Sequence, residues 1–195
     1  MRSGALNLTS HHARRAWICL LIAWWCCSLP GETWAQSYLG GTVSQVVDGD
    51  TLTLTDSKQR RTRIRLAGID APECSMPSGG EARQHLLQLA LGHEVQAHIR
   101  GFDRYGRTVA IVELDGSDLN LAMIAAGWAW HDPRYTGKST GAWATKYAAA
   151  QGAARAHGLG LWDTSSNTEP WKWRRNHAGY RRGVCGVSAP AVASP

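Results

Sequence analysis

Short segments of alternating residues, joined by tight turns, constrain the fold of this 195-residue chain more than any other feature. In residues 43–56, valine, threonine and leucine alternate with other residues on both sides of Asp48-Gly49. An Asp-Gly pair between two such segments is a strong signal of a two-residue β-hairpin turn. Residues 61–68 alternate again, with Ile64 and Leu66 on one face and arginines on the other. Two further segments indicate strands: residues 94–100 and 107–114.

Three segments follow helical periodicity instead. The first is predicted to begin after Ser78-Gly-Gly-Glu81, which has the pattern of a capping box, and to end at Gly92. The second is predicted to have Ser117 as its N-cap and to run to Ala126, and the third covers about residues 139–157. Short hairpin-linked strands combined with three helices favour an α+β fold that is mainly β. We expect a small closed β-barrel with the helices packed against it.

The first 35 residues have the organisation of a secretory signal peptide. Arg14 and Arg15 precede an uncharged run, residues 16–27, that is too short to span a bilayer, because a spanning helix needs about 20 residues. Small residues then predict cleavage after Ala35. We therefore expect an exported protein, either periplasmic or secreted. The alternative is an uncleaved membrane anchor.

Two of the five cysteines lie beyond this segment, Cys74 and Cys185. Thiols of exported proteins are commonly paired, because their compartment is oxidising. This suggests a disulfide between the two residues, which would contribute roughly 4–5 kcal/mol before strain in the loop-entropy description. The alternative is two unrelated thiols.

Residues 166–195 form a basic tail that contains tryptophan. Pro170-Trp-Lys-Trp-Arg-Arg175 interleaves aromatic with basic residues, which suits single-stranded nucleic acid through stacking and phosphate contacts. The alternative is that Trp171 and Trp173 pack against the barrel. We expect a tail that is partly docked through these two tryptophans and largely disordered beyond them.

The charge of the chain favours a polyanionic partner. Lysine and arginine number 21 against 15 aspartates and glutamates, which gives a formal net charge of +6. Such a balance is typical of proteins that bind nucleic acid or an anionic membrane surface. The sequence has no glycine-rich phosphate loop ending in Gly-Lys-Ser/Thr, so this class of nucleotide site is excluded.

Three acidic residues are predicted at strand ends or in loops: Asp50, Asp70 and Glu73. Hard cations such as Ca²⁺ and Mg²⁺ bind carboxylate and carbonyl oxygens, and Asp50 and Asp70 could supply two such ligands. Glu73 follows the stiff Pro72 and could hold a water molecule as a general base. Taken alone, Asp50 is more simply an acid beside a turn. Asp48 is interpreted as a turn residue only.

Arg65 and Arg107 could neutralise a phosphate. Arginine suits this role because its planar guanidinium makes two parallel hydrogen bonds and keeps its proton. Taken alone, each arginine is more simply a solvated strand residue. Arg61 and Arg63 are interpreted in that way, or as part of a surface that faces nucleic acid.

Three motifs that hold these residues occur in order along the chain. They are Val46-Val-Asp-Gly-Asp-Thr51, Arg65-Leu-Ala-Gly-Ile-Asp-Ala-Pro-Glu73 and Asp103-Arg-Tyr-Gly-Arg107. Together they resemble the staphylococcal nuclease family. The similarity continues through Asn120 and Gly160-Leu-Trp162 and covers about residues 40–165. We therefore place a nuclease domain at residues 36–165, between the signal peptide (1–35) and the tail (166–195).

The resemblance implies a five-stranded barrel of the oligonucleotide-binding (OB) type with three helices. It implies hydrolysis of DNA and RNA that depends on one Ca²⁺ ion and leaves 3′-phosphate ends, with Mg²⁺ as the alternative ion. A preference for single strands is also implied. We further expect a monomer with no obligate protein partner and no membrane association once the signal peptide is removed.

The resemblance also implies a set of metal ligands. Asp50 and Asp70 match the carboxylates that hold Ca²⁺ in the family. Ala71 matches the position whose backbone carbonyl is the next ligand. The archetype of the family has threonine there, so this chain loses a side-chain hydroxyl while it keeps the carbonyl.

Other positions match residues that contact the substrate. Arg65 and Arg107 match the phosphate-binding arginines, and Glu73 matches the carboxylate proposed to activate water. Positions that match residues beside the nucleotide are Arg104, Tyr105 and Tyr135.

Two alternatives belong to other functional classes. The first is an OB-type barrel that binds single-stranded nucleic acid without catalysis. The acidic set argues against it, because carboxylates on a binding face repel phosphate unless a metal is present. The second is a phosphodiesterase that acts on small molecules, which would share the chemistry and would be distinguished by a size series of substrates.

Overall fold

The computed structural model describes residues 38–135, 142–163, 168–177 and 185, all within the compact unit Gln36–Pro195. The predicted signal peptide and its alternative, a membrane anchor, lie outside these residues, so both stay predictions. Within the described ranges, no helix is both long and apolar enough to cross a membrane.

Five strands form a closed barrel, which confirms the predicted architecture. They are β1 (Tyr38–Asp48), β2 (Thr51–Thr55), β3 (Arg61–Leu66), β5 (Glu94–Phe102) and β6 (Thr108–Leu114). Neighbouring strands pair antiparallel in the order β3-β2-β1-β5-β6, and a parallel pairing of β3 with β6 closes the barrel. The closure sets Arg65 opposite Val109. It therefore brings the strand that carries Arg65 next to the strand that follows Arg107.

Three short strands extend this barrel. Strand β7 (Ser117–Asp118) continues from β6 through a tight turn. Strand β4 (Ile69–Asp70) pairs with β8 (Trp130–His131) in a separate two-stranded sheet. In that sheet Asp70 lies opposite Trp130. The segment with Asp70, which the sequence predicts to be a loop, is thus held as a short strand. This pairing fixes the direction of the Asp70 carboxylate.

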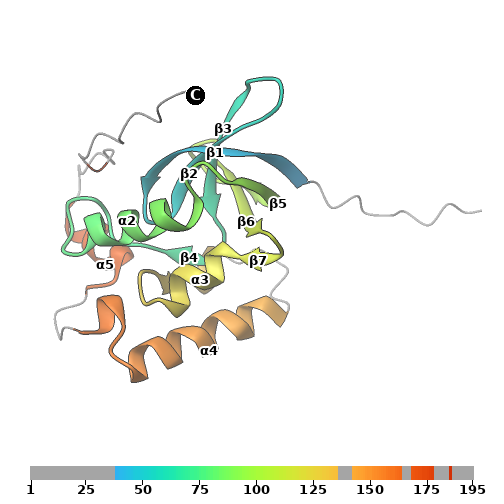
Figure 1. Ribbon diagram of the computed structural model, residues 1–195. Helices are drawn as coiled ribbons and strands as arrows, with labels where there is room; N and C mark the ends of the chain where they lie inside the picture. Colours follow the sequence, from blue (N-terminus) through green and yellow to red (C-terminus); the bar gives the residue numbers. More distant parts are fainter. Residues whose placement is uncertain (1–37, 136–141, 164–167, 178–184, 186–195) are drawn as a thin grey trace, which may run out of the picture. The chain divides into compact units, whose positions relative to one another are not determined.

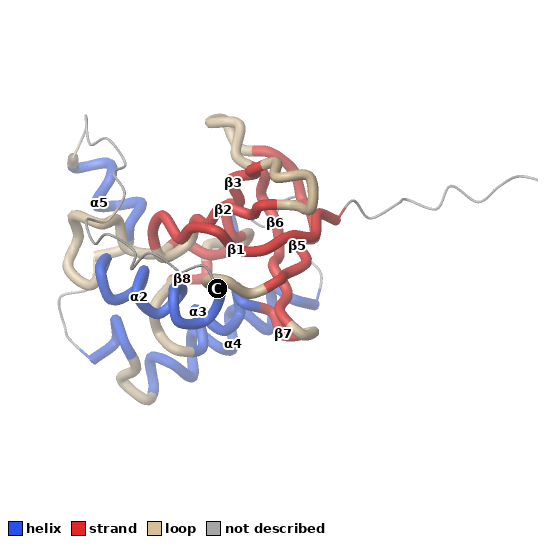
Figure 2. The backbone as a smooth tube through the Cα atoms, turned by 45° about the horizontal axis from the view of Figure 1, so that its top comes forward, coloured by secondary structure: helices blue, strands red, loops and turns tan. Residues whose placement is uncertain are grey.

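The three predicted helices gather on one side of the barrel (Figures 1 and 2). They are α2 (Gly79–Ala90), α3 (Leu119–Ala125) and α4 (Ala142–Ala156). A fourth helix, α5 (Pro170–Asn176), lies within residues 166–195, which the sequence predicts to be a tail. The described part of the chain also holds two 3₁₀ turns, Pro133–Tyr135 and Gly160–Asp163.

One of the two predicted helix caps has the right position, and the other is wrong. Ser78 is the N-cap residue of α2, as predicted, but its backbone is left-handed with φ of 65° and its side chain makes no capping hydrogen bond. For α3 the cap is Asp118, not Ser117, and its carboxylate accepts from Leu121 N over 2.9 Å. A carboxylate at this position also interacts favourably with the positive end of the helix dipole, so Asp118 is the better cap.

The core lies inside the barrel and continues into the helices. Residues such as Leu52, Ile64 and Met123 are fully buried. Asn120 of α3 is buried among them, and its amide binds three backbone groups of the barrel. It donates to the carbonyls of Ala67 and Ala110 at 2.9 and 3.1 Å and accepts from Val112 N at 3.1 Å. Asn120 therefore attaches α3 to the barrel wall by hydrogen bonds as well as by packing.

Candidate active site

The turn between β1 and β2 positions the first carboxylate. Asp48 is nearly buried, and its Oδ1 accepts from Asp50 N over 3.0 Å, so Asp48 shapes the turn. Asp50 Oδ2 accepts from Ala71 N, also over 3.0 Å. A Cβ atom at Gly49 would lie 2.7 Å from the Cβ of Ala71 and 2.9 Å from that of Ala82. Glycine at 49 and a small residue at 71 therefore let this turn approach the Asp70 segment.

Arg65 links the two aspartates. Its Nη2 lies 3.2 Å from Asp50 Oδ2 and 3.2 Å from Asp70 Oδ1, and its Nη1 donates to Leu66 O over 2.9 Å. Only 2% of its side chain is exposed, whereas Arg61 and Arg63 of the same strand are exposed. A buried guanidinium with these partners is held in one orientation. Arg65 is thus distinct from the other two arginines of β3.

The second carboxylate, Asp70, is fully buried. Burial raises the pKa of Asp70 above its ordinary value, although the cations of Arg65 and Arg174 pull the pKa down. This buried acid therefore depends on neighbouring positive charge to stay ionised. In the structure that charge comes from the two guanidinium groups.

Arg174 of α5 contacts both Asp70 and Glu73. Its Nη2 lies 2.6 Å from Asp70 Oδ2, and its Nη1 lies 3.2 Å from Asp70 Oδ1 and 2.7 Å from Glu73 Oε1. Burial lowers the pKa of Arg174, but these hydrogen bonds outweigh burial and raise it above the ordinary value. Arg174 is therefore a permanent cation between the two acids.

The loop that carries Glu73 is packed tightly against α2. A Cβ atom at Gly79 would collide with the carbonyl oxygen of Glu73, so only glycine fits there. Cys74, the next residue after Glu73, is joined to Cys185 by a disulfide. The backbone that presents Glu73 is thus fixed on one side by α2 and on the other by a covalent link to the tail.

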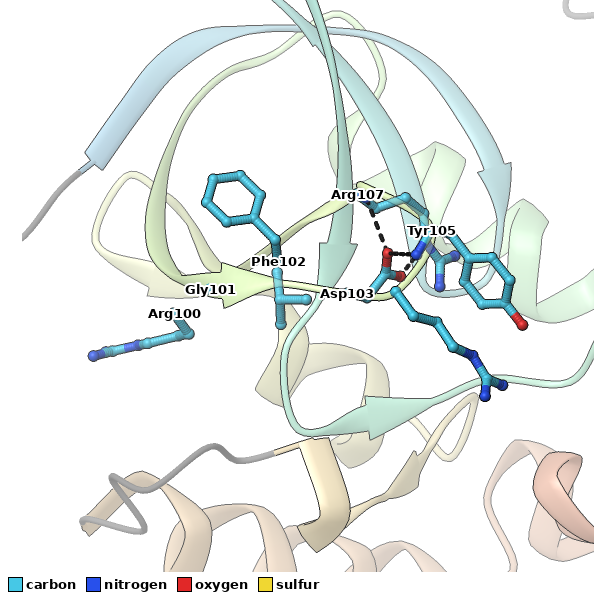
Figure 3. Close-up of a pocket in the computed structure, with 8 residues that line it drawn as sticks. Arg100, Gly101, Phe102, Asp103, Tyr105 and Arg107 are labelled. Carbon is cyan, nitrogen blue, oxygen red and sulfur yellow. Dashed lines mark hydrogen bonds and ion pairs between the residues drawn. The ribbon is translucent and has the colours of Figure 1, made fainter.

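Arg107 joins the same cluster through Thr51. Its Nη1 donates to Thr51 Oγ1 over 3.2 Å, and Thr51 Oγ1 donates to Asp50 Oδ1 over 2.9 Å. Asp103 holds the guanidinium from the other side, with Nε 2.6 Å from Asp103 Oδ2. Figure 3 shows the contact between Arg107 and Asp103 within the β5–β6 loop. A continuous path of polar contacts therefore connects Arg107 with Asp50.

The β5–β6 loop also forms a shallow pocket of about 400 Å³ beside Arg107. Tyr105 is 63% exposed, and the guanidinium carbons of Arg104 and Arg107 lie 5.0 and 5.7 Å from its ring centre. Phe102, which is also exposed, lies on the opposite side of the loop from Tyr105 (Figure 3). An exposed ring flanked by cations is suited to stacking on a base next to a phosphate.

The structure thus brings together Asp50, Arg65, Asp70, Glu73 and Arg107, with the backbone of Ala71 attached to Asp50. Arg104 and Tyr105 lie in the adjoining pocket. Tyr135 ends the turn Pro133–Tyr135, but its side chain lies outside the described residues.

The donor set fits a hard cation at Asp50 and Asp70. Two buried carboxylates converge on one positively charged nitrogen of Arg65, and carboxylate oxygens are the ligands that Ca²⁺ and Mg²⁺ prefer. Among the described residues no three histidine, cysteine, aspartate or glutamate side chains form a cluster suited to a metal. Two carboxylates would therefore need backbone oxygens and water to complete a coordination shell.

Two members of the cluster were missed by sequence reasoning, Thr51 and Arg174. Thr51 follows Asp50 directly in the first motif, so a β2 hydroxyl beside a predicted ligand was available as a signal. Arg174 carried no such signal. It lies 101 residues beyond Glu73 in a tail whose tryptophans were expected to make the contacts. In the structure Trp171 packs under the guanidinium of Arg134, 4.7 Å from ring centre to carbon, and Trp173 stacks on His177.

Carboxylates and arginines gathered at one edge of a closed barrel are suited to the hydrolysis of phosphodiesters. A sequence model described as "Staphylococcal nuclease homologue" matches residues 63–164. The chain belongs to the staphylococcal nuclease family.

Relatives from several organisms support this assignment. A micrococcal nuclease of Shigella flexneri is 40% identical over 144 residues, which cover 69% of this chain and 80% of that protein. An uncharacterised endonuclease of Haemophilus influenzae is 37% identical over 68% of this chain and 71% of its own length. A staphylococcal-like nuclease of Arabidopsis thaliana is 36% identical, but the match covers only 35% of that longer protein.

Proposed function

We propose that this hydrolytic nuclease cleaves phosphodiester bonds of DNA and RNA with one bound Ca²⁺ ion and leaves 3′-phosphate ends. The observation that carries the proposal is the convergence of Asp50 and Asp70 on Arg65, in a buried cluster at the edge of a barrel. A nuclease needs positive charge where a phosphate binds and carboxylates where a cation binds. This cluster has both within a few ångströms.

Asp50, Asp70 and the carbonyl of Ala71 would hold the ion. When bound, Ca²⁺ supplies positive charge that stabilises the phosphoryl oxygens during attack. Burial supports this role for Asp70, because a carboxylate removed from water gains most from a cation next to it. Mg²⁺ is the alternative ion, and it demands a stricter geometry than Ca²⁺ does.

Arg65 and Arg107 would bind the phosphate from two directions. Each carries a guanidinium, a group that can donate to phosphate oxygens. Asp103 and Thr51 hold the Arg107 side chain, which lowers the entropy lost when it binds substrate. Glu73 would orient and deprotonate the attacking water, and the 5′ oxygen would depart on the opposite side.

The pocket of Arg104 and Tyr105 would bind the nucleotide, with Tyr135 as a further contact at the rim. Tyr105 offers an exposed ring for base stacking, and stacking is available only to bases that are not paired within a duplex. This supports a preference for single-stranded DNA and RNA. Small-molecule phosphodiesters would not span both the cluster and this pocket.

Export remains part of the proposal. The charged and apolar segments before Ala35 support a cleaved signal peptide, and the Cys74–Cys185 disulfide is suited to an oxidising compartment. We propose a periplasmic or secreted monomer, with no obligate protein partner and no membrane association after cleavage.

The experiment is degradation of heat-denatured DNA by the purified protein, with Ca²⁺ and with a chelator. We expect rapid degradation with Ca²⁺, none with chelator, and loss of activity in Glu73→Gln, together with 3′-phosphate ends on the products. DNA that is retarded on a gel but intact under both conditions would instead indicate a binding barrel without catalysis.

A further inference from the structure

Helix α5 contacts the carboxylate at which the proposed function places the ion. Both carboxylate oxygens of Asp70 accept hydrogen bonds from Arg174, over 3.2 and 2.6 Å. The same guanidinium also donates to Glu73 Oε1 over 2.7 Å. A two-nitrogen fork on a carboxylate is among the strongest side-chain pairs. A cation that binds Asp70 therefore competes with Arg174 for the oxygens of this carboxylate.

We propose that Arg174 is an internal inhibitor: without bound ion its guanidinium occupies Asp70 and Glu73, and Ca²⁺ has to displace it. This inference rests on the proposed function. It adds a regulatory contact between the tail and the site, carried by a residue outside the three sequence motifs.

The contact of Arg174 with Asp70 and Glu73 can be broken without unfolding the barrel. Helix α5 has seven residues, and a helix of that length is marginal without tertiary contacts. It packs through side chains that include the buried Pro170 and the Trp171 ring beside Arg134. The side chain of Arg174 is 22% exposed, so water and ions reach its guanidinium. Displacement of Arg174 is thus a local event that leaves the barrel core intact.

The disulfide keeps the inhibitor close after displacement. Cys74 follows Glu73 directly, and Cys185 lies beyond α5 in the same tail. A covalent tether turns rebinding into an intramolecular step at high effective concentration. Arg174 therefore competes with Ca²⁺ at every protein concentration, and the competition lowers the apparent affinity for the ion.

The test measures Ca²⁺ binding by calorimetry, with Ca²⁺ alone and no nucleic acid. Arg174→Gln is compared with the wild type and with Arg175→Gln, which removes the same charge from an exposed neighbour on the same helix. We expect Arg174→Gln to bind Ca²⁺ about tenfold more tightly. Arg175→Gln is expected to stay within about twofold of the wild type, as for a screened surface charge.

Two further variants sharpen the result. Arg174→Lys keeps the charge but cannot contact both acids through a planar fork, so its Ca²⁺ affinity should be intermediate. The double variant Cys74→Ser/Cys185→Ser removes the tether and should shift the affinity in the same direction as Arg174→Gln, by less. Adding Arg174→Gln to the double variant should then raise the Ca²⁺ affinity no further than Arg174→Gln alone does.

Several outcomes would overturn the inference. They are an unchanged or weaker Ca²⁺ affinity in Arg174→Gln, an equal gain in Arg175→Gln, and no Ca²⁺ binding by any variant. Weaker binding would make Arg174 a part of the site and not its occupant. A parallel nuclease assay separates the two proposals. Ca²⁺-dependent cleavage with equal affinities would defeat only the inhibitor, whereas tighter binding without cleavage would defeat only the nuclease.

Discussion

Arg107 donates to the hydroxyl of Thr51 over 3.2 Å, although 56 residues separate the two along the chain. Thr51 in turn donates to Asp50 over 2.9 Å. A single hydroxyl thus connects the arginine of one loop with the carboxylate of another, and Thr51 acts as a positioning residue for both.

We expect Thr51→Val to lower the cleavage rate about tenfold, because valine keeps the shape but breaks both hydrogen bonds. The KM for DNA should change little, and the Ca²⁺ concentration for half-maximal rate should rise. The matched control is Thr55→Val on the same strand, whose hydroxyl contacts only Ser44 among the hydrogen bonds resolved for it. Equal effects of the two substitutions would contradict the positioning role.

Arg65→Lys should cost about a hundredfold in rate. An ammonium is a point charge and cannot serve Asp50, Asp70 and a phosphate with a planar fork. Cleavage of heat-denatured DNA at saturating Ca²⁺ measures the effect, with Arg63→Lys on the exposed face of β3 as the control. Near-normal turnover of Arg65→Lys would refute the phosphate clamp.

Asn120→Ala should lower the free energy of unfolding by about 3 kcal/mol or more, because two carbonyls and one N–H of the barrel lose a buried partner. Urea unfolding at neutral pH measures this loss. The activity of the remaining folded protein should persist at low temperature, since Asn120 makes no contact with the carboxylate cluster. A loss below about 1 kcal/mol would show that packing alone holds α3.

Asp48 makes stability depend on pH. Burial, reinforced by the charge of Asp50, raises its pKa from 3.8 to about 7. An acid with a higher pKa in the folded than in the unfolded protein loses stability as pH rises between the two values. Asp48→Asn keeps the turn acceptor and removes the buried charge.

The free-energy gain of Asp48→Asn should therefore be near zero at about pH 4 and reach about 2–4 kcal/mol above pH 7. Urea unfolding across this range, with chelator present, tests the prediction. Asp163→Asn, at an exposed position, is the control. A gain for Asp48→Asn that does not vary with pH would contradict the burial argument.

Much of the fold could be predicted because each of the five barrel strands carries its own signal. The alternation before Asp48-Gly49 reflects burial of one face of β1, where Val43 is buried between the exposed Thr42 and Ser44. The helix caps were harder to predict. Ser78 and Ser117 have the right residue type, but a left-handed backbone at Ser78 and the better-placed carboxylate of Asp118 decided the geometry.

The site, like the fold, has a part that could be predicted from the sequence and a part that could not. Asp50, Asp70 and Glu73 lie in ordered motifs, so their convergence could be anticipated from the sequence. Arg174 could not be anticipated, because its partners are defined only once the tail folds back over the β4 segment. No local pattern encodes a contact across 101 residues, and the neighbouring tryptophans gave a stronger but different signal.

The most direct test of the central claim compares Asp70→Asn with the wild type in a Ca²⁺ titration of cleavage on heat-denatured DNA. Circular dichroism verifies that the variant is folded, and Asp115→Asn serves as the control because Asp115 is an exposed acid at a positive φ that asparagine accepts. We expect a loss of about a thousandfold or more in Asp70→Asn, with no rescue by Ca²⁺, and no loss in the control. A folded Asp70→Asn protein with the wild-type rate and the wild-type Ca²⁺ midpoint would show that Asp70 does not hold the ion.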